Sequence, residues 1–194
     1  MFQVRIHGRG GQGVVSAAEM LSIAAFDEGL FAQAFPSFGS ERMGAPVTAF
    51  CRFDDREIRS REPVMAPDAL IIQDPTLLHQ VDVFAGLSRE GYILINSSRD
   101  FALLGLGDFV RDYPEGHCCS VAASEIAMKE VGRPLPNAAL LGAFAAITGR
   151  LSLESVCRAI AGKFAGKVGE ANVRAARAAF DVAAASRRKE ALHA

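Results

Sequence analysis

The sequence is poor in cysteine, lacks tryptophan, and has charges that nearly cancel. Its four cysteines, at positions 51, 118, 119 and 157, form no Cys-x-x-Cys pair, which argues against a zinc site or iron–sulfur cluster held by this chain. So few cysteines give no disulfide framework, and we expect a cytoplasmic protein. With 21 Lys and Arg against 22 Asp and Glu, the net charge is −1. That balance disfavours nucleic-acid binding through a basic field.

Long apolar runs are also missing. No stretch of the sequence approaches the roughly 18–20 apolar residues that span a bilayer, so we expect no membrane association. The N-terminal segment lacks the apolar core and cleavage site of a signal peptide. Half of the 194 residues are nevertheless hydrophobic, which excludes a disordered chain and predicts a single domain over residues 1–194.

Strand and helix patterns alternate along the first two-thirds of the chain. Strands are expected at Phe2–His7, Leu30–Phe35, Pro46–Phe53, Ala69–Gln73, Gly91–Ile95 and His117–Val121. Helices are expected from Val14 to a cap at Gly29, and at Ala122–Val131, Asn137–Thr148, Leu153–Phe164 and Val168–Ala191, with a helical turn at Pro75–Gln80 and N-caps at Asn137 and Ser152. Asp54-Asp55 is expected to turn the chain into a hairpin with Glu57–Arg61. Together these patterns predict an α/β fold: a Rossmann-like, mainly parallel sheet with flanking helices and a helical C-terminal third.

The most informative motif is the glycine loop between the first strand and the first helix. Gly8, Gly10 and Gly13 form a G-x-G-x-x-G pattern in the segment GRGGQGV. Glycines allow positive φ and let a ligand approach the backbone closely. Amides at a helix start, together with the helix dipole, favour phosphate or another anion. The alternative is a glycine-rich turn that is needed only for strand–helix packing.

The rest of a dinucleotide site is missing. A Rossmann site places Asp or Glu at the end of the second strand to hold the ribose, but that segment is Ala32-Gln33-Ala34-Phe35. The Gly-Lys-Ser/Thr of a P-loop is absent as well. The sequence therefore disfavours NAD and favours a different phosphate-bearing ligand or the backbone of a partner.

Polar residues at two further points are candidates for the same crevice. The loop PSFGSERMG, from Pro36 to Gly44, holds Arg42, which would either bind a phosphate or pair with neighbours of Glu41 or a partner subunit. Asn96 and Ser97 follow a buried strand and would either reach the crevice or form a simple turn. We interpret His7 as a structural residue. Cys118 and Cys119 are expected on opposite faces of the sheet, and no Ser–His–Asp set supports nucleophilic catalysis.

Basic residues are concentrated near the C-terminus. Between Arg158 and Glu190, eight basic residues stand against three acidic ones. We interpret them as a solvated helix surface, and a docking surface for an acidic partner is the alternative.

Taken in order, several segments resemble one family. GRGGQGVVSAA at 8–18, FPSFGSERMGAPV at 35–47, Asp74-Pro75-Thr76 and Asn96-Ser97 together resemble the gamma subunit of 2-oxoacid:acceptor oxidoreductases, the pyruvate:ferredoxin oxidoreductase group. The resemblance covers about residues 2–165.

The resemblance implies a subunit of an enzyme that oxidatively decarboxylates a 2-oxo acid to its acyl-coenzyme A. Thiamine diphosphate with magnesium and [4Fe–4S] clusters would be held by the alpha, beta and ferredoxin-like delta subunits. A further NADH-linked flavoprotein with FAD is possible within the family. Phenylglyoxylate is the favoured substrate, with pyruvate and 2-oxoglutarate as alternatives.

The same resemblance implies a gamma chain that binds no cofactor alone and has no catalytic or metal-binding residue, but helps to form the coenzyme A site and subunit interfaces. We expect no activity from the isolated chain. The residues expected at the coenzyme A site or an interface are Gly8, Arg9, Gly10, Gly11, Gln12, Gly13, Val14, Ser37, Phe38, Gly39, Arg42, Asn96 and Ser97. Two other functions stay open: a nucleotide-binding Rossmann-type dehydrogenase, and an assembly module without a ligand.

Overall fold

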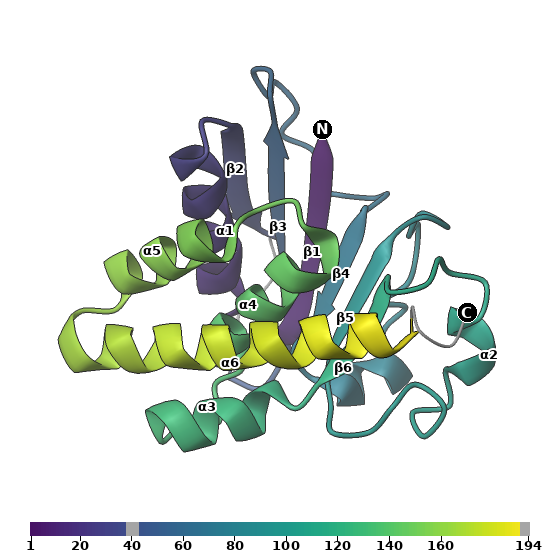
Figure 1. Ribbon diagram of the computed structural model, residues 1–194. Helices are drawn as coiled ribbons and strands as arrows, with labels where there is room; N and C mark the ends of the chain where they lie inside the picture. Colours follow the sequence, from purple (N-terminus) through teal and green to yellow (C-terminus); the bar gives the residue numbers. More distant parts are fainter. Residues whose placement is uncertain (38–42, 191–194) are drawn as a thin grey trace.

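The computed structural model of the chain describes residues 1–37 and 43–190. Six strands form one sheet in the order β2-β3-β1-β4-β5-β6 (Figure 1). The strands are β1 (Phe2–Arg9), β2 (Phe31–Pro36), β3 (Pro46–Asp54), β4 (Ala69–Ile72), β5 (Tyr92–Asn96) and β6 (Cys118–Val121). The helices are α1 (Val14–Asp27), α2 (Gly107–Val110), α3 (Ala123–Val131), α4 (Asn137–Thr148), α5 (Leu153–Lys163) and α6 (Gly166–Glu190), with a 3-10 helix, η1, at Pro75–His79. These elements confirm the predicted α/β fold.

Parallel and antiparallel strand pairings occupy opposite halves of the sheet. β1, β4, β5 and β6 run parallel, with Ile6 beside Ile71 and Ile71 beside Leu94. β3 pairs antiparallel with β1 on one side and with β2 on the other. The parallel strands β4 and β5 are apolar and almost wholly buried, as expected where both faces of a sheet are covered. β2 and β6 are the edges.

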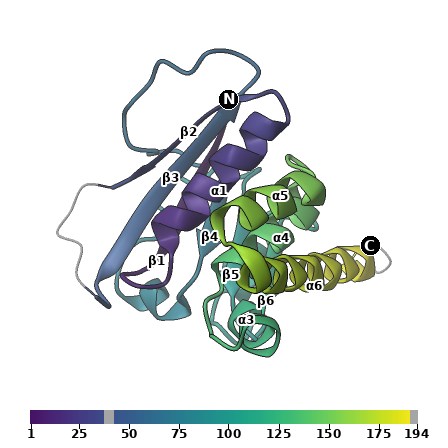
Figure 2. The same ribbon diagram turned by 90° about the vertical axis from the view of Figure 1, so that its left-hand side faces the viewer.

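Helices α1, α4, α5 and α6 lie on one face of the sheet (Figure 2). Ile71 and Leu94 pack in the main core beneath these helices, whereas Ile72 and Ile95 pack in a smaller core on the opposite face, with η1 and α2. This alternation follows from the two-residue period of a strand. The C-terminal helices therefore cover one face of the sheet.

The helix α4 lies at the centre of the helical layer. Eleven of its twelve residues are buried, so it has no solvent-facing side. Gly142 faces the backbone of α6, where an added Cβ would overlap the carbonyl of Ala176. Ala175 and Ala179 of α6 are also fully buried. Small residues on both helices therefore allow a close backbone approach.

The prediction of a hairpin with residues 57–61 is wrong, because this segment forms no strand. Side chains of the sheet bind its carbonyl groups instead. Gln33 Nε2 donates to the carbonyl of Ile58 at 3.1 Å, and the guanidinium of Arg52 donates to the carbonyl of Glu62. The antiparallel pair in this region is made by β2 and β3.

The two predicted helix caps have different outcomes. Ser152 is the N-cap of α5, and its hydroxyl accepts from the amide of Ser155 at 3.2 Å. Asn137 is not the cap, because it is the first residue of α4, and Pro136 occupies the N-cap position. The Asn137 side chain is buried instead, and its Oδ1 accepts from the amide of Ala138 at 2.9 Å.

Four basic residues of α5 and α6 pair with acidic residues on other helices. Arg158 lies 3.2 Å from Asp27, and Lys163 lies 2.7 Å from Glu19. Such partly exposed pairs contribute little stability, and they fit the interpretation of a solvated helix surface.

Among the described helices, none has the length and hydropathy needed to cross a membrane.

Candidate functional site

The glycine loop connects the end of β1 to the start of α1, at the edge of the sheet where the parallel strands end. Gly11 and Gly13 have φ values of +93° and +72°, and Gly13 is the N-cap of α1. Residues that carry a side chain rarely adopt this left-handed backbone conformation. The motif therefore produces the tight strand-to-helix turn that the sequence predicts.

The loop uses part of its backbone internally. The amide of Gly10 donates to the carbonyl of Ala45 at 2.9 Å, and the carbonyl of Gly10 accepts from the amide of Gly44 at 3.1 Å. The amide of Arg9 donates to Oε1 of Gln12 at 2.8 Å. Gly10 thus extends the ladder between β1 and β3, and its amide is not open to a ligand.

Other amides at the start of α1 remain open. Within residues 1–37 and 43–190, no acceptor binds the amides of Gly11, Gly13 or the first three residues of the helix, 14–16. The first turn of any helix leaves such donors unpaired. A hollow of about 340 Å³ lies there, lined by Arg9, Gly10, Gly11, Gly13, Val14, Val15, Ser16 and Val47. This geometry suits an anionic group.

Two glycines of the motif have packing roles. A Cβ on Gly8 would lie 2.6 Å from Cγ2 of Val14, and one on Gly13 would lie 2.5 Å from Nδ2 of Asn137. Glycine at these positions allows strand, helix and α4 to approach one another. The packing interpretation therefore accounts for Gly8 and Gly13, although Gly13 also lines the hollow.

A polar cluster fixes the loop to the end of β4. Arg9 Nε and Gln12 Nε2 each lie 3.0 Å from Oδ2 of Asp74, and Arg9 Nη2 lies 2.7 Å from Oγ1 of Thr76. Burial alone would raise the pKa of Asp74, but hydrogen bonds from Thr76 and Gln12 and the charge of Arg9 hold this pKa below its usual value. Arg9 and Gln12, both predicted site residues, are therefore engaged in anchoring the loop.

Asn96 and Ser97 line a different hollow. Its volume is about 450 Å³, and its other lining residues include Thr76, His79 and Arg99. Asn96 is held internally: its Nδ2 donates to the carbonyl of Gln73 and to Oγ of Ser124, both at 2.8 Å. Asn96 and Ser97 therefore line a hollow separate from that at the glycine loop, and both hollows adjoin the Arg9–Asp74–Thr76 cluster.

The loop after β2 is described only in part. The amide of Ser37 donates to the carbonyl of Thr48 at 2.8 Å, so Ser37 continues the β2–β3 pairing. The predicted site residues Phe38, Gly39 and Arg42 lie outside the described residues, as do Ser40 and Glu41.

The remaining candidates have structural surroundings. His7 Nε2 accepts from Nε of Arg5 at 3.1 Å, and its Nδ1 lies 3.3 Å from Oγ1 of Thr48. Burial and the charge of Arg5 lower the pKa of His7 to about 4, so His7 is neutral at pH 7, which supports its structural interpretation.

Cys118 and Cys119 face opposite cores, as predicted. The described residues contain no group of three His, Cys, Asp or Glu that could hold a metal ion.

Gln73, Asp74 and Thr76 adjoin the candidate site but are not among the predicted site residues, although Asp74 and Thr76 belong to a segment that carries the family resemblance. The signal was present, since polar residues directly after a buried parallel strand lie at the ligand-binding edge of an α/β sheet. Gln73 is 1% exposed, and neither polar atom of its side chain has a hydrogen-bond partner among the described residues.

Comparison with known proteins gives the class. The model of the pyruvate ferredoxin/flavodoxin oxidoreductase family matches residues 3–182. The chain belongs to this family.

Within the family, its relatives are gamma subunits. The chain is 45% identical over 181 residues to the pyruvate synthase subunit PorC of Methanothermobacter thermautotrophicus, covering 93% of this chain and 95% of that protein. It is 46% identical over 183 residues to the common gamma subunit of the pyruvate/ketoisovalerate oxidoreductases of Pyrococcus furiosus, covering 93% and 96%. The protein is thus a gamma-type subunit of a 2-oxoacid oxidoreductase, as its motifs predict.

Solved structures agree with this assignment. The crystal structure of the pyruvate oxidoreductase subunit PORC of Thermotoga maritima has a TM-score of 0.77 at 37% identity, covering 93% of this chain and 95% of that one. The 2-oxoglutarate:ferredoxin oxidoreductase of Magnetococcus marinus, solved with 2-oxoglutarate, coenzyme A and succinyl-CoA, has a TM-score of 0.68 at 18% identity. This chain matches 31% of that one, and the likeness concerns the fold.

Proposed function

We propose that this chain is the non-catalytic gamma subunit of a complex that converts pyruvate, or a similar 2-oxo acid, to its acyl-coenzyme A, and that it helps to bind coenzyme A. The relatives are named for pyruvate and ketoisovalerate, which favours pyruvate. The expectation of phenylglyoxylate gains no support from them, and with it the reason for an additional NADH-linked flavoprotein is lost.

The hollow at the start of α1 carries the coenzyme A proposal. Glycines 10, 11 and 13 are among its lining residues, and open amides of Gly11, Gly13 and residues 14–16 lie there. Coenzyme A carries a pyrophosphate and a further phosphate, and amides at a helix N-terminus are suitable donors to such groups. Because Arg9 is engaged with Asp74, the backbone rather than this guanidinium would supply the recognition.

Partner subunits would supply the reactive groups. Thiamine diphosphate with magnesium and [4Fe–4S] clusters need ligands that the described part of the chain does not group together. We therefore infer that alpha, beta and ferredoxin-like delta subunits hold these groups in the cytoplasm, and that gamma positions coenzyme A beside them.

A substitution of Ser16 tests the proposal in the assembled complex. Ser16 lines the hollow, and an aspartate in the first turn of a helix is compatible with folding. Ser16→Asp should raise the KM for coenzyme A about tenfold, since a carboxylate would repel phosphate, and should leave the KM for pyruvate and the iron content unchanged. Ser16→Asn is the control of matched size. Equal KM values for coenzyme A in the two variants would refute the binding role.

Of the two alternative functions, the assembly module has more structural support than the dehydrogenase. The packing of Gly8 and Gly13 supports an assembly module without a ligand, which predicts no difference between Ser16→Asp and Ser16→Asn. The dehydrogenase alternative gains no support, because the strand between β1 and β2 is the antiparallel β3 and β2 carries no acidic residue. The position of a Rossmann ribose-binding acid therefore does not exist here.

A further inference from the structure

The strand β2 has a free edge. It pairs with β3 on one side, and no other described strand adjoins it. Ser37 donates to Thr48 within the β2–β3 ladder, and in an antiparallel pair alternate residues point their backbone groups inward and outward. The amides and carbonyls of Ala32 and Ala34 therefore point away from β3. Pro36, which has no amide to offer, occupies the next outward position.

The sequence of β2 is a palindrome. Phe31-Ala32-Gln33-Ala34-Phe35 reads the same in both directions about Gln33. In an antiparallel pair of two such strands centred on Gln33, Ala32 of each copy faces Ala34 of the other, and Phe31 of each faces Phe35 of the other. Such aromatic cross-strand pairs stabilise antiparallel sheets. The strand is therefore self-complementary in one register.

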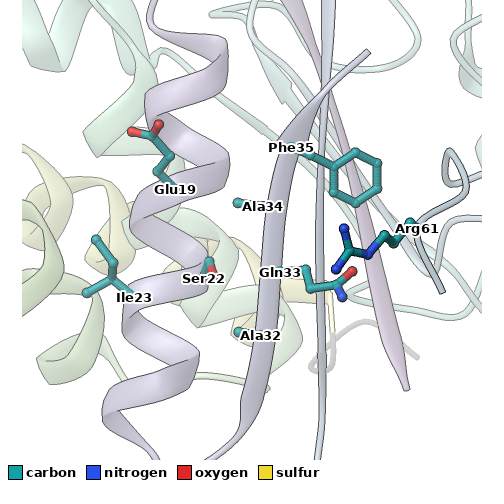
Figure 3. Close-up of a pocket in the computed structure, with 8 residues that line it drawn as sticks. All are labelled: Glu19, Ser22, Ile23, Ala32, Gln33, Ala34, Phe35 and Arg61. Carbon is teal, nitrogen blue, oxygen red and sulfur yellow. The ribbon is translucent and has the colours of Figure 1, made fainter. Parts of the chain in front are cut away.

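A hollow lies along this free edge. Its volume is about 690 Å³, the largest of those described, and α1 contributes Glu19, Ser22 and Ile23 to its wall. Figure 3 shows these side chains on one side of β2, with Phe35 and Arg61 on the other. The side chains of Ala32 and Ala34 lie between and are small enough to leave room. A second strand has space to approach.

Exposed apolar side chains flank the same edge. Phe31 is 50% exposed, and Phe26, at the end of α1, is 73% exposed. An edge strand with apolar residues and no charged side chain lacks the usual protection against pairing with another strand. These exposed apolar side chains are suited to burial against a partner.

We propose that two copies of this chain associate through β2, antiparallel about Gln33, so that their six-stranded sheets join into one continuous sheet. The amide of Ala32 in each copy donates to the carbonyl of Ala34 in the other, and the amide of Ala34 donates to the carbonyl of Ala32. A second copy explains the palindrome, which an unrelated strand would not require. Arg61 lies on the same side of β2 as Phe35 (Figure 3), where a guanidinium can pack on an aromatic ring.

Cysteine cross-linking tests the register in the full chain and in the assembled complex. Gln33→Cys places two thiols directly opposite each other, so mild oxidation should give a gamma–gamma disulfide. Ala32→Cys and Ala34→Cys should each cross-link poorly alone and efficiently when mixed. The unmodified chain measures the background from its own cysteines. No cross-linking of Gln33→Cys above that background would overturn the proposal, as would equal yields for all single variants.

A second experiment does not depend on disulfide geometry. Ala34→Pro removes an amide that points to solvent in the single copy, where proline is tolerated at a sheet edge. It should weaken dimerisation of the full chain at least about tenfold in sedimentation equilibrium, whereas Ala34→Ser, which keeps the amide, should dimerise like the unmodified chain. A monomeric unmodified chain at high concentration, together with a single gamma copy per complex, would also exclude the pairing.

Discussion

The guanidinium of Arg9 lies 3.0 Å from the carboxylate of Asp74 and joins the end of β1 to the end of β4. The side chains are 21% and 15% exposed, so this pair is more shielded than the ion pairs on the helix surfaces. The glycine loop is consequently attached to the parallel half of the sheet as well as to β3.

Arg9→Met should therefore destabilise the protein. It removes the donors to Asp74 and Thr76 while keeping an aliphatic side chain, and we expect a loss of about 1–3 kcal/mol in the free energy of unfolding. Arg89, whose pair with Asp112 is largely exposed, is the control, and Arg89→Met should change stability by less than about 0.5 kcal/mol. Urea denaturation measures both. Similar losses in the two variants would show that the loop is not anchored in this way.

Substitution of Gly13 separates backbone strain from steric overlap. Gly29 has a similar φ, +81°, but nothing lies within 4 Å of its added Cβ. Gly29→Ala should therefore cost about 1–2 kcal/mol from conformation alone. Gly13→Ala should cost at least about 3 kcal/mol, because the new methyl group also overlaps the amide of Asn137. Adding Asn137→Ala should recover part of this difference, and a strictly additive double variant would contradict the contact.

The acid sensitivity of the fold should depend on His7. Its pKa is about 4 in the folded protein against 6.5 for the free side chain, so the unfolded chain takes up the proton first as the pH falls. His7 therefore favours folding fully above pH 6.5, and this contribution decreases down to about pH 4. At pH 4.5 we expect a loss of about 2.5 kcal/mol relative to pH 7.5. His7→Gln should flatten this pH dependence in urea titrations, and an unchanged slope would contradict it.

Two helical glycines should respond in opposite directions to alanine. Gly142 of α4 has no room for a Cβ beside Ala176, whereas nothing lies within 4 Å of a Cβ added to Gly162 of α5. Gly142→Ala should cost more than about 3 kcal/mol through forced helix separation, and Gly162→Ala should stabilise by about 0.5–1 kcal/mol through helix propensity. Thermal unfolding measures both. A tolerated Gly142→Ala would show that α6 is less closely packed.

Much of the fold follows from local patterns. The six strands lie within one or two residues of their predicted bounds, because short apolar runs such as Leu70–Ile72 are flanked by turn residues. The helix α2 was not predicted, because its four residues are too few to show a helical period. The hairpin prediction failed because long-range bonds from Gln33 and Arg52 hold the following segment, and no local pattern encodes such partners.

The candidate site was only partly predictable. The glycine spacing gives the turn and the open helix start, since both depend on local backbone conformation. It does not give the use of Gly10 in a strand ladder or the contact between Gly13 and Asn137, because both partners are distant in the sequence. Nor does it separate Asn96 from the loop, since the internal bonds of Asn96 to Gln73 and Ser124 depend on the packed sheet.

The burial of α4 on every side limits how far the protein tolerates truncation. A shortened form that stops before Gly166 would lose α6 and leave a helix without any polar surface in contact with water. Such a product would be prone to aggregation. The alanine-rich helix α6 is therefore needed to shield α4 and the hydrophobic core from water.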